Sequence, residues 1–107
     1  MNASVAIQVL PGVTEREETR RLVDAAIDRI RETGLRYVVG PFETTVEGEL
    51  EELLNLVKDC CRACVEAGAP ELMAYVKISY EPNGVWTIDD KTGKYKDAWE
   101  VEHCGEK

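Results

Sequence analysis

The sequence predicts an α+β fold in which two helices cover one face of a four-stranded antiparallel sheet. Two segments, residues 3–10 and 71–81, alternate apolar residues with other residues, as half-buried strands do. Between these segments, two stretches repeat their apolar residues at helical spacing. The resulting order is β-α-β-β-α-β in two halves of similar length, which is typical of the ferredoxin-like sandwich.

The first half begins with a strand at residues 3–10, where every second residue faces the same side. Pro11-Gly12 ends this strand. Thr14 and the acidic run that follows it predict a helix that starts with the threonine hydroxyl as its cap. Apolar residues then recur at helical spacing through residues 22–30, and Gly34 ends the helix.

The second half begins with "RYVVGPFETTV", which is β-branched and aromatic and contains Gly40-Pro41. It predicts two short strands, at about 36–40 and 43–47, joined by a turn or bulge. A second helix follows Gly48, and the alternating "ELMAYVKISYE" is the last strand. The predicted core stripe of this helix comprises Leu50, Leu53, Leu54, Val57, Cys61, Cys64 and Val65.

We expect residues 1–107 to form a single domain, with a core at about 3–82 and a C-terminal extension at 83–107. The extension contains "VWTIDDKTGKYKDAWEV". This segment fits either a short helical turn that starts at Thr87 or a hairpin around Asp90–Gly93, and the sequence leaves both alternatives open.

Composition restricts the partners of this chain. Its formal net charge is −8, and an acidic surface repels nucleic-acid phosphates. No apolar run reaches the roughly 18–20 residues that a membrane span requires. The N-terminus "MNASVAIQVLPG" also lacks the basic start and long apolar region of a secretion signal. We therefore expect a cytoplasmic protein that binds neither nucleic acid nor membrane.

Two helices can cover only one face of the predicted sheet, so the other face stays open. Small and amphipathic side chains dominate this open face, which carries less charge than most solvated sheet faces. Such side chains suit a face that packs against a second subunit or lines a pocket. An ordinary half-exposed face is the alternative, and a contact with a second subunit is the interpretation we favour. The open-face residues are Ser4, Ala6 and Gln8 of the first strand and Met73, Tyr75, Lys77 and Ser79 of the last.

The segment "ETTVEGEL" at residues 43–50 combines two threonines with three carboxylates. Helix initiation explains Gly48 and Glu49, because glycine permits a turn and acids favour a helix N-terminus. It does not explain the threonines. Thr44 and Thr45 point to opposite faces of a strand, so one hydroxyl faces the open side. A hydroxyl and a carboxylate there suit a small, polar, cationic ligand.

The cluster "CCRAC" places Cys60, Cys61 and Cys64 within five residues. Its CxxC spacing allows a metal or redox site. The alternative is core packing, because Cys61 and Cys64 fall on the predicted core stripe and a buried free cysteine behaves as a small hydrophobe. Only His103 and Cys104 remain as further zinc ligands, far along the chain. We favour core packing and predict no metal.

Nothing in the sequence identifies an enzyme. His103 is the only histidine, and we assign it to the polar tail. A histidine-centred nucleophilic triad therefore has no basis. The chain also lacks a P-loop and a GxGxxG motif.

Three phrases together resemble the thiamine-binding protein family, long carried as the uncharacterised family UPF0045 or DUF77 and related to the hydroxymethylpyrimidine-binding protein YkoF. They are "VAIQVLPG", "TGLRYVVGPFETTVEGELEELLNLVKDC" and "VKISYE", and the resemblance spans about residues 3–82. It implies a ferredoxin-like fold, sheets paired into dimers and a homotetramer built as a dimer of dimers. It also implies binding of thiamine or its hydroxymethylpyrimidine part, with no catalysis and no cofactor.

By this resemblance, Thr45 and Glu47 are the leading ligand contacts, and Tyr37, Thr44 and Gln8 are further candidates. A flat aminopyrimidine requires hydrogen-bonding groups and an aromatic or apolar wall, and a carboxylate suits the thiazolium cation.

The chain departs from the family pattern in two places. Its end keeps Lys91 of the family's short last helix but adds Gly93 and a longer tail, and "CCRAC" is not a family hallmark. Two alternatives to ligand binding therefore stay open, namely a cysteine-based metal or thiol protein and a structural or regulatory oligomer without a ligand.

Overall fold

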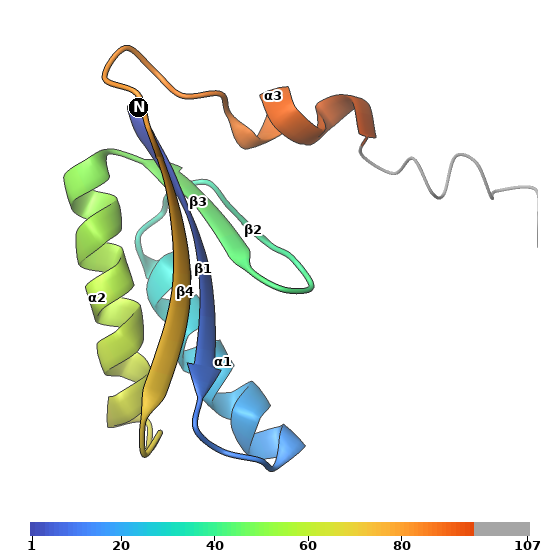
Figure 1. Ribbon diagram of the computed structural model, residues 1–107, viewed down its shortest axis with the longest axis vertical. Coiled ribbons are helices and arrows are strands. Elements are labelled where there is room, and N and C mark those ends of the chain that lie inside the picture. The colour runs from blue at the N-terminus through green and yellow to red at the C-terminus, as the bar shows by residue number, and fades with distance from the viewer. Residues whose placement is uncertain (96–107) are drawn as a thin grey trace, which may run out of the picture.

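The computed structural model describes residues 1–95 and shows the predicted β-α-β-β-α-β order followed by a short third helix (Figure 1). The strands run in the order β2-β3-β1-β4, and every pairing is antiparallel. This is the ferredoxin-like arrangement that the sequence predicts. The elements are β1 (Ala3–Pro11), α1 (Arg16–Glu32), β2 (Tyr37–Val39), β3 (Thr44–Gly48), α2 (Leu50–Glu66), β4 (Leu72–Tyr80) and α3 (Ile88–Thr92), and a 3-10 turn (Gly93–Tyr95) follows.

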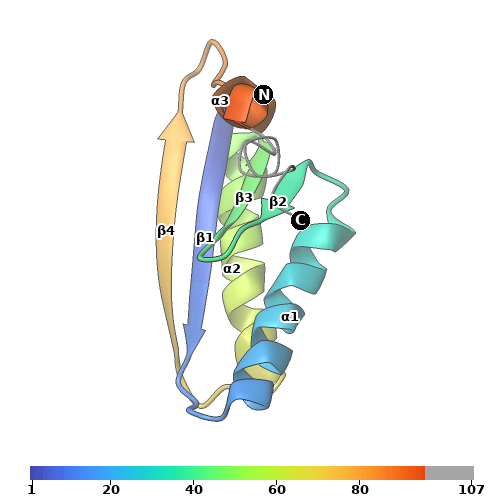
Figure 2. The same cartoon turned by 90° about the vertical axis from the view of Figure 1, so that its right-hand side faces the viewer.

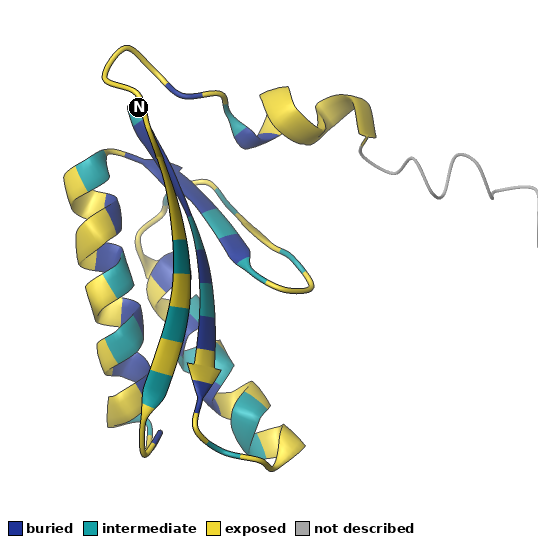
Figure 3. Ribbon diagram, viewed as in Figure 1, coloured by how far each residue is buried: buried dark blue, intermediate teal, exposed yellow. Residues whose placement is uncertain are grey.

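The core lies between the sheet and the two long helices. β1 is an inner strand of the sheet, with β3 on one side and β4 on the other. Val5 pairs with Val46 of β3 and Ile78 of β4, and alternate β1 residues face the helices. Figure 3 shows β1 and β3 buried over most of their lengths, whereas α3 is mostly exposed. Figure 2 gives a second view of the sheet, with α2 packed along the strands. Burial of apolar surface on this face stabilises the fold.

The start of α1 differs from the prediction. The helix begins at Arg16 with Glu15 as its N-cap residue, and Thr14 is exposed. The acids Glu17 and Glu18 lie in the first turn, where a negative charge is favourable whether or not a side chain caps the helix. The acidic run was therefore a correct signal for a helix start, and the choice of Thr14 as the cap was wrong.

The start of α2 is fixed by one side chain from the N-terminus and one from the helix itself. The Leu50 amide donates to Oδ1 of Asn2 at 2.9 Å, and the Glu49 amide donates to Oε1 of Glu52 at 2.7 Å. Gly48 ends β3 at this point, and a Cβ there would lie 2.7 Å from the same Glu52 oxygen. Helix initiation therefore accounts for Gly48 and Glu49, as the sequence predicts.

The core stripe of α2 differs from the predicted stripe. Leu54 and Val65 are 46% and 53% exposed, whereas Leu53 and Cys64 face the core as predicted. The apolar residues of α2 cover a wide arc of the helix, and contact with α1 selects which part of it is buried. The buried residues of α2 are Leu53, Leu56, Cys60, Ala63 and Cys64.

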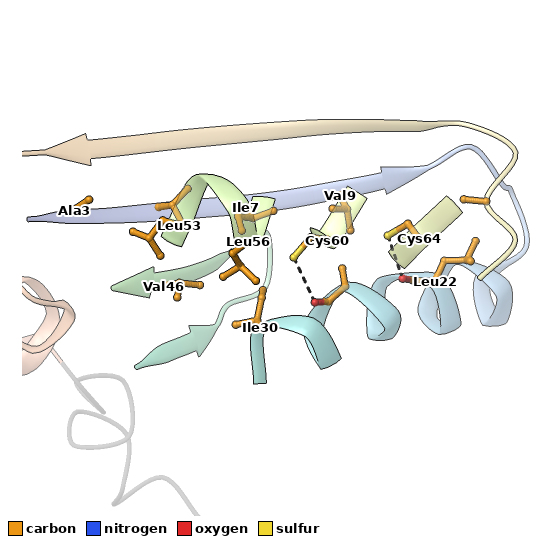
Figure 4. Close-up of a cluster of buried hydrophobic side chains, with 13 residues drawn as sticks. Ala3, Ile7, Val9, Leu22, Ile30, Val46, Leu53, Leu56, Cys60 and Cys64 are labelled. Atoms are coloured by element: carbon orange, nitrogen blue, oxygen red, sulfur yellow. Dashed lines mark hydrogen bonds between the residues drawn. The ribbon is translucent and has the colours of Figure 1, made fainter. Parts of the chain in front are cut away.

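Two of the three clustered cysteines belong to this core. The Cys60 thiol donates to the Ala26 carbonyl at 3.5 Å, and the Cys64 thiol donates to the Leu22 carbonyl at 3.4 Å (Figure 4). Burial raises the pKa of Cys60 from 9.0 to about 12 and raises the pKa of Cys64 as well. Core packing is thus correct for Cys64, but Cys60 takes the place predicted for the half-buried Cys61.

The first part of the C-terminal extension forms the helical turn rather than the hairpin. Thr87 caps α3, because its hydroxyl accepts from the Asp90 amide and the Asp90 carboxylate accepts from the Thr87 amide, both at 2.9 Å. These bonds lower the pKa of Asp90 below its ordinary value. Trp99, His103 and Cys104 lie outside the described residues. No helix within residues 1–95 is long and apolar enough to cross a membrane.

We expect Leu53→Ala to lower the free energy of unfolding by about 2–5 kcal/mol, because it empties a core position. Leu54→Ala removes the same atoms from an exposed position of the same helix and should cost less than about 1 kcal/mol. Guanidinium denaturation followed by circular dichroism measures both values. Equal losses for the two variants would contradict the observed phase of α2.

We also expect Cys61 to react with iodoacetamide well before Cys60 and Cys64 in the native protein. With a pKa of about 12, roughly one Cys60 thiol in ten thousand is ionised at pH 8. The same raised pKa predicts that the stability from burying the neutral thiol is complete below pH 9 and is lost as the pH rises toward 12. Peptide mass spectrometry of timed labelling measures the order, and early labelling of Cys60 would overturn it.

Candidate functional site

The open face of the sheet carries a pocket of about 550 Å³. Its floor includes Ser4 and Ala6 of β1 and Thr45 of β3. Serine and alanine have small side chains, so β1 leaves a hollow on the open face of the sheet. On the opposite face, the valine and isoleucine side chains of the same strand fill the core. The other residues that line the pocket are Val5, Arg36, Val38, Glu43, Lys77, Ile78, Ser79, Trp86, Ile88, Asp89, Lys91 and Thr92.

Strand register brings the floor residues together. Ala6 pairs with Thr45 on one side and with Lys77 on the other. Ser4 in turn pairs with Glu47 and Ser79. The pocket floor therefore follows two neighbouring rows of polar and small side chains, one across β3, β1 and β4 and the next across β1 and β4 only, because Glu47 does not line the pocket.

Two ion pairs connect elements around the pocket. Lys77 Nζ lies 3.1 Å from a Glu43 oxygen and links β4 to the segment before β3. An Arg36 nitrogen lies 3.2 Å from Oδ1 of Asp89 and links the segment before β2 to α3. These side chains are solvent-accessible, so each pair contributes little stability. Their main effect is to place both signs of charge at the pocket.

Glu47 is a buried carboxylate on the otherwise open face, with only 7% of the residue exposed. Its Oε2 accepts a hydrogen bond from the Ile88 amide at 2.9 Å. Ile88 is the first residue of α3 and is itself buried. Glu47 therefore joins β3 to the start of the helix that forms one wall of the pocket.

The residues that the sequence singled out separate into two groups. Thr45 lines the pocket, and Glu47 and Gln8 share its face of the sheet, with Gln8 paired to Tyr75 beyond the floor rows. Thr44 is buried opposite Ile7 on the helix side. Tyr37 pairs with Val46 on that side as well, and contact with its hydroxyl raises the pKa of Arg31 on α1.

Sequence reasoning missed most of the walls. Arg36 and Asp89 are 53 residues apart, so only the folded chain shows that they meet. The spacing of Thr87 and Asp90, which supports a capping box, was the one signal for the wall that α3 supplies. Nothing in the sequence showed that this helix lies over the sheet.

The pocket suits recognition of a small polar molecule. It offers hydroxyl groups at Ser4, Ser79 and Thr45, charges of both signs, and the 68% exposed Trp86 as an aromatic surface. Within residues 1–95, no group of three or more histidine, cysteine or acidic side chains is placed to hold a metal ion. The site therefore offers groups for hydrogen bonding, stacking and charge.

Comparisons with known proteins agree on one family. The family model described as thiamine-binding protein matches residues 5–96. A UPF0045 protein from Clostridium perfringens is 43% identical over 93 residues, which are 87% of this chain and 96% of that protein.

Solved structures show the same relationship. A DUF77 domain of unknown function from Bacillus cereus has a TM-score of 0.81 and 41% identity and covers 92% of this chain and 93% of its own. A candidate thiamine biosynthesis/salvage protein from Thermotoga maritima has a TM-score of 0.79 and 38% identity and covers 89% and 99%. The chain belongs to the thiamine-binding protein family.

Proposed function

We propose that this protein binds thiamine or its hydroxymethylpyrimidine moiety in the open-face pocket, as a cytoplasmic binding protein without catalytic activity or cofactor. The observation that carries the proposal is the pocket itself, whose lining includes both the Thr45 hydroxyl and the aromatic Trp86 in a chain of this family. The Thermotoga maritima relative, named for thiamine biosynthesis or salvage, supports the same ligand class.

The pocket offers a partner for each part of such a ligand. Trp86 supplies a face for the flat pyrimidine. The hydroxyls of Thr45 and Ser4 both donate and accept, which matches ring nitrogens and an exocyclic amine. The carboxylates of Glu43 and Asp89 compensate the cationic thiazolium, although each already has a basic partner. The lining also includes Lys91, so it carries three basic side chains and two carboxylates, and we expect the polar floor rather than net charge to set the orientation of the ligand.

We further propose that the open face also contacts a second copy of the chain, as one interface of a dimer of dimers. Beyond the pocket, the face continues into Leu10, Met73 and Tyr75, which are exposed large hydrophobic residues. A contiguous apolar surface of this kind is typical of a subunit contact. This second role needs no ligand, so an oligomer without a ligand is the competing interpretation.

Thr45→Val is the sharpest test of ligand binding, because valine keeps the shape and β-branching of threonine and removes only the hydroxyl. We expect calorimetry to show thiamine or hydroxymethylpyrimidine binding that weakens by roughly 5- to 20-fold in this variant, as loss of one hydrogen bond implies. Thr14→Val, at an exposed position before α1, is the matched control and should bind as wild type. No heat with either ligand at millimolar concentration would refute the proposed function.

Met73→Glu tests the proposed subunit contact, because it places a charge at a 60% exposed position of the open face. We expect light scattering after size-exclusion chromatography to show a smaller assembly than wild type. Val65→Glu on α2 introduces the same charge at a similarly exposed position away from the sheet and should leave the mass unchanged. A monomeric wild type, or equal masses for all three proteins, would contradict the interface.

A further inference from the structure

Glu47 stands out because a carboxylate is rarely buried without a specific partner. The residue is 7% exposed, and its Oε2 is 2.9 Å from the Ile88 amide nitrogen. A carboxylate that accepts from a backbone amide makes a charge-assisted hydrogen bond, which is stronger than one between neutral groups. Glu47 therefore has a structural use within the chain as the acceptor for this amide.

That bond determines where α3 lies. The helix has five residues, and a helix this short has little stability of its own. Apart from the bonds within it, the contacts that hold α3 among residues 1–95 are the Glu47–Ile88 hydrogen bond, burial of Ile88 and the exposed Arg36–Asp89 pair. Of these, the Glu47 bond is the buried polar one and ties the first turn of α3 directly to β3.

The position of α3 in turn determines the shape of the pocket. Ile88, Asp89, Lys91 and Thr92 of this helix line it, and Trp86 lies two residues before the helix. Glu47 does not line the pocket, although Thr45 two residues away on the same strand face does. A substitution at Glu47 would therefore affect ligand binding indirectly, by changing the position of α3 and of the residues that it places around the pocket.

We propose that Glu47 is a positioning residue, which binds the start of α3 and thereby completes the pocket wall rather than touching the ligand. This inference rests on the proposed function for its binding consequence, but the anchoring of α3 stands apart from any ligand. The competing role is direct contact, in which the Glu47 charge binds the cationic thiazolium ring of thiamine.

Two substitutions separate these roles. Glu47→Gln removes the charge and keeps an oxygen that accepts from the Ile88 amide, whereas Glu47→Ala removes the acceptor. For a positioning residue, we expect Gln to bind thiamine and the uncharged hydroxymethylpyrimidine within about threefold of wild type, and Ala to weaken both by about tenfold or more. If Gln weakens thiamine as much as Ala does and leaves hydroxymethylpyrimidine unaffected, Glu47 is a charge contact and the proposal is wrong.

Amide hydrogen exchange of the ligand-free protein tests the anchoring without any ligand. We expect exchange at residues 85–92 to be faster in Glu47→Ala than in wild type, and close to wild type in Glu47→Gln. Glu43→Gln removes a carboxylate from the same pocket without a bond to α3 and should leave this exchange unchanged. If wild type binds neither ligand, the proposed function fails while this result still decides the role of Glu47; unchanged exchange in Glu47→Ala overturns the inference.

Discussion

The alternation along β1 is the constraint on which the core and the pocket both depend. β1 pairs with β4 over nine residues and with β3 over five, so it cannot shift register without breaking two ladders. In this register, Val5, Ile7 and Val9 fill the core, and Ser4 and Ala6 leave a hollow on the opposite face. A slip of one residue would exchange these two sets, so the same pairing that stabilises the fold also shapes the site.

The short α3 supplies one wall of the pocket, because the face of a sheet alone can form a floor but does not enclose a ligand. It lies near the N-terminal end of β1, opposite α2 in Figure 1, and it meets β3 through Glu47 and the Arg36 segment through Asp89. Its backbone is ordered locally by the Thr87–Asp90 capping box, whereas its place over the sheet depends on these distant partners. Local contacts thus form the helix, and long-range contacts place it at the pocket.

The sequence predicted the strands closely because period-two alternation and the Gly and Pro breaks are local signals. β1 and β3 end within one residue of their predicted bounds, and the separation of Thr44 from Thr45 by face follows directly from strand geometry. The prediction of which side of α2 is buried was partly wrong for a physical reason. Both Leu53 and Leu54 fit an apolar stripe, and only the packing against α1 distinguishes them. The ion pairs and the Glu47 bond join residues 34 to 53 apart, and no local pattern predicts such contacts.

The open face connects the two proposed roles of the protein physically. A pocket that is open on one side leaves part of a small ligand in water, and polar contacts are weaker where water competes. The exposed Met73 and Tyr75 lie on the same face as the pocket floor. They are spaced by two residues from each other and from Lys77 along β4, and alternate residues of a strand face the same side. A second copy seated on these residues would therefore border the pocket, exclude water from its mouth and strengthen the hydrogen bonds made at Thr45. Under the two proposals, assembly and ligand binding would be coupled through one surface, and such a contact would account for large apolar side chains on a face where a solvated sheet carries charges.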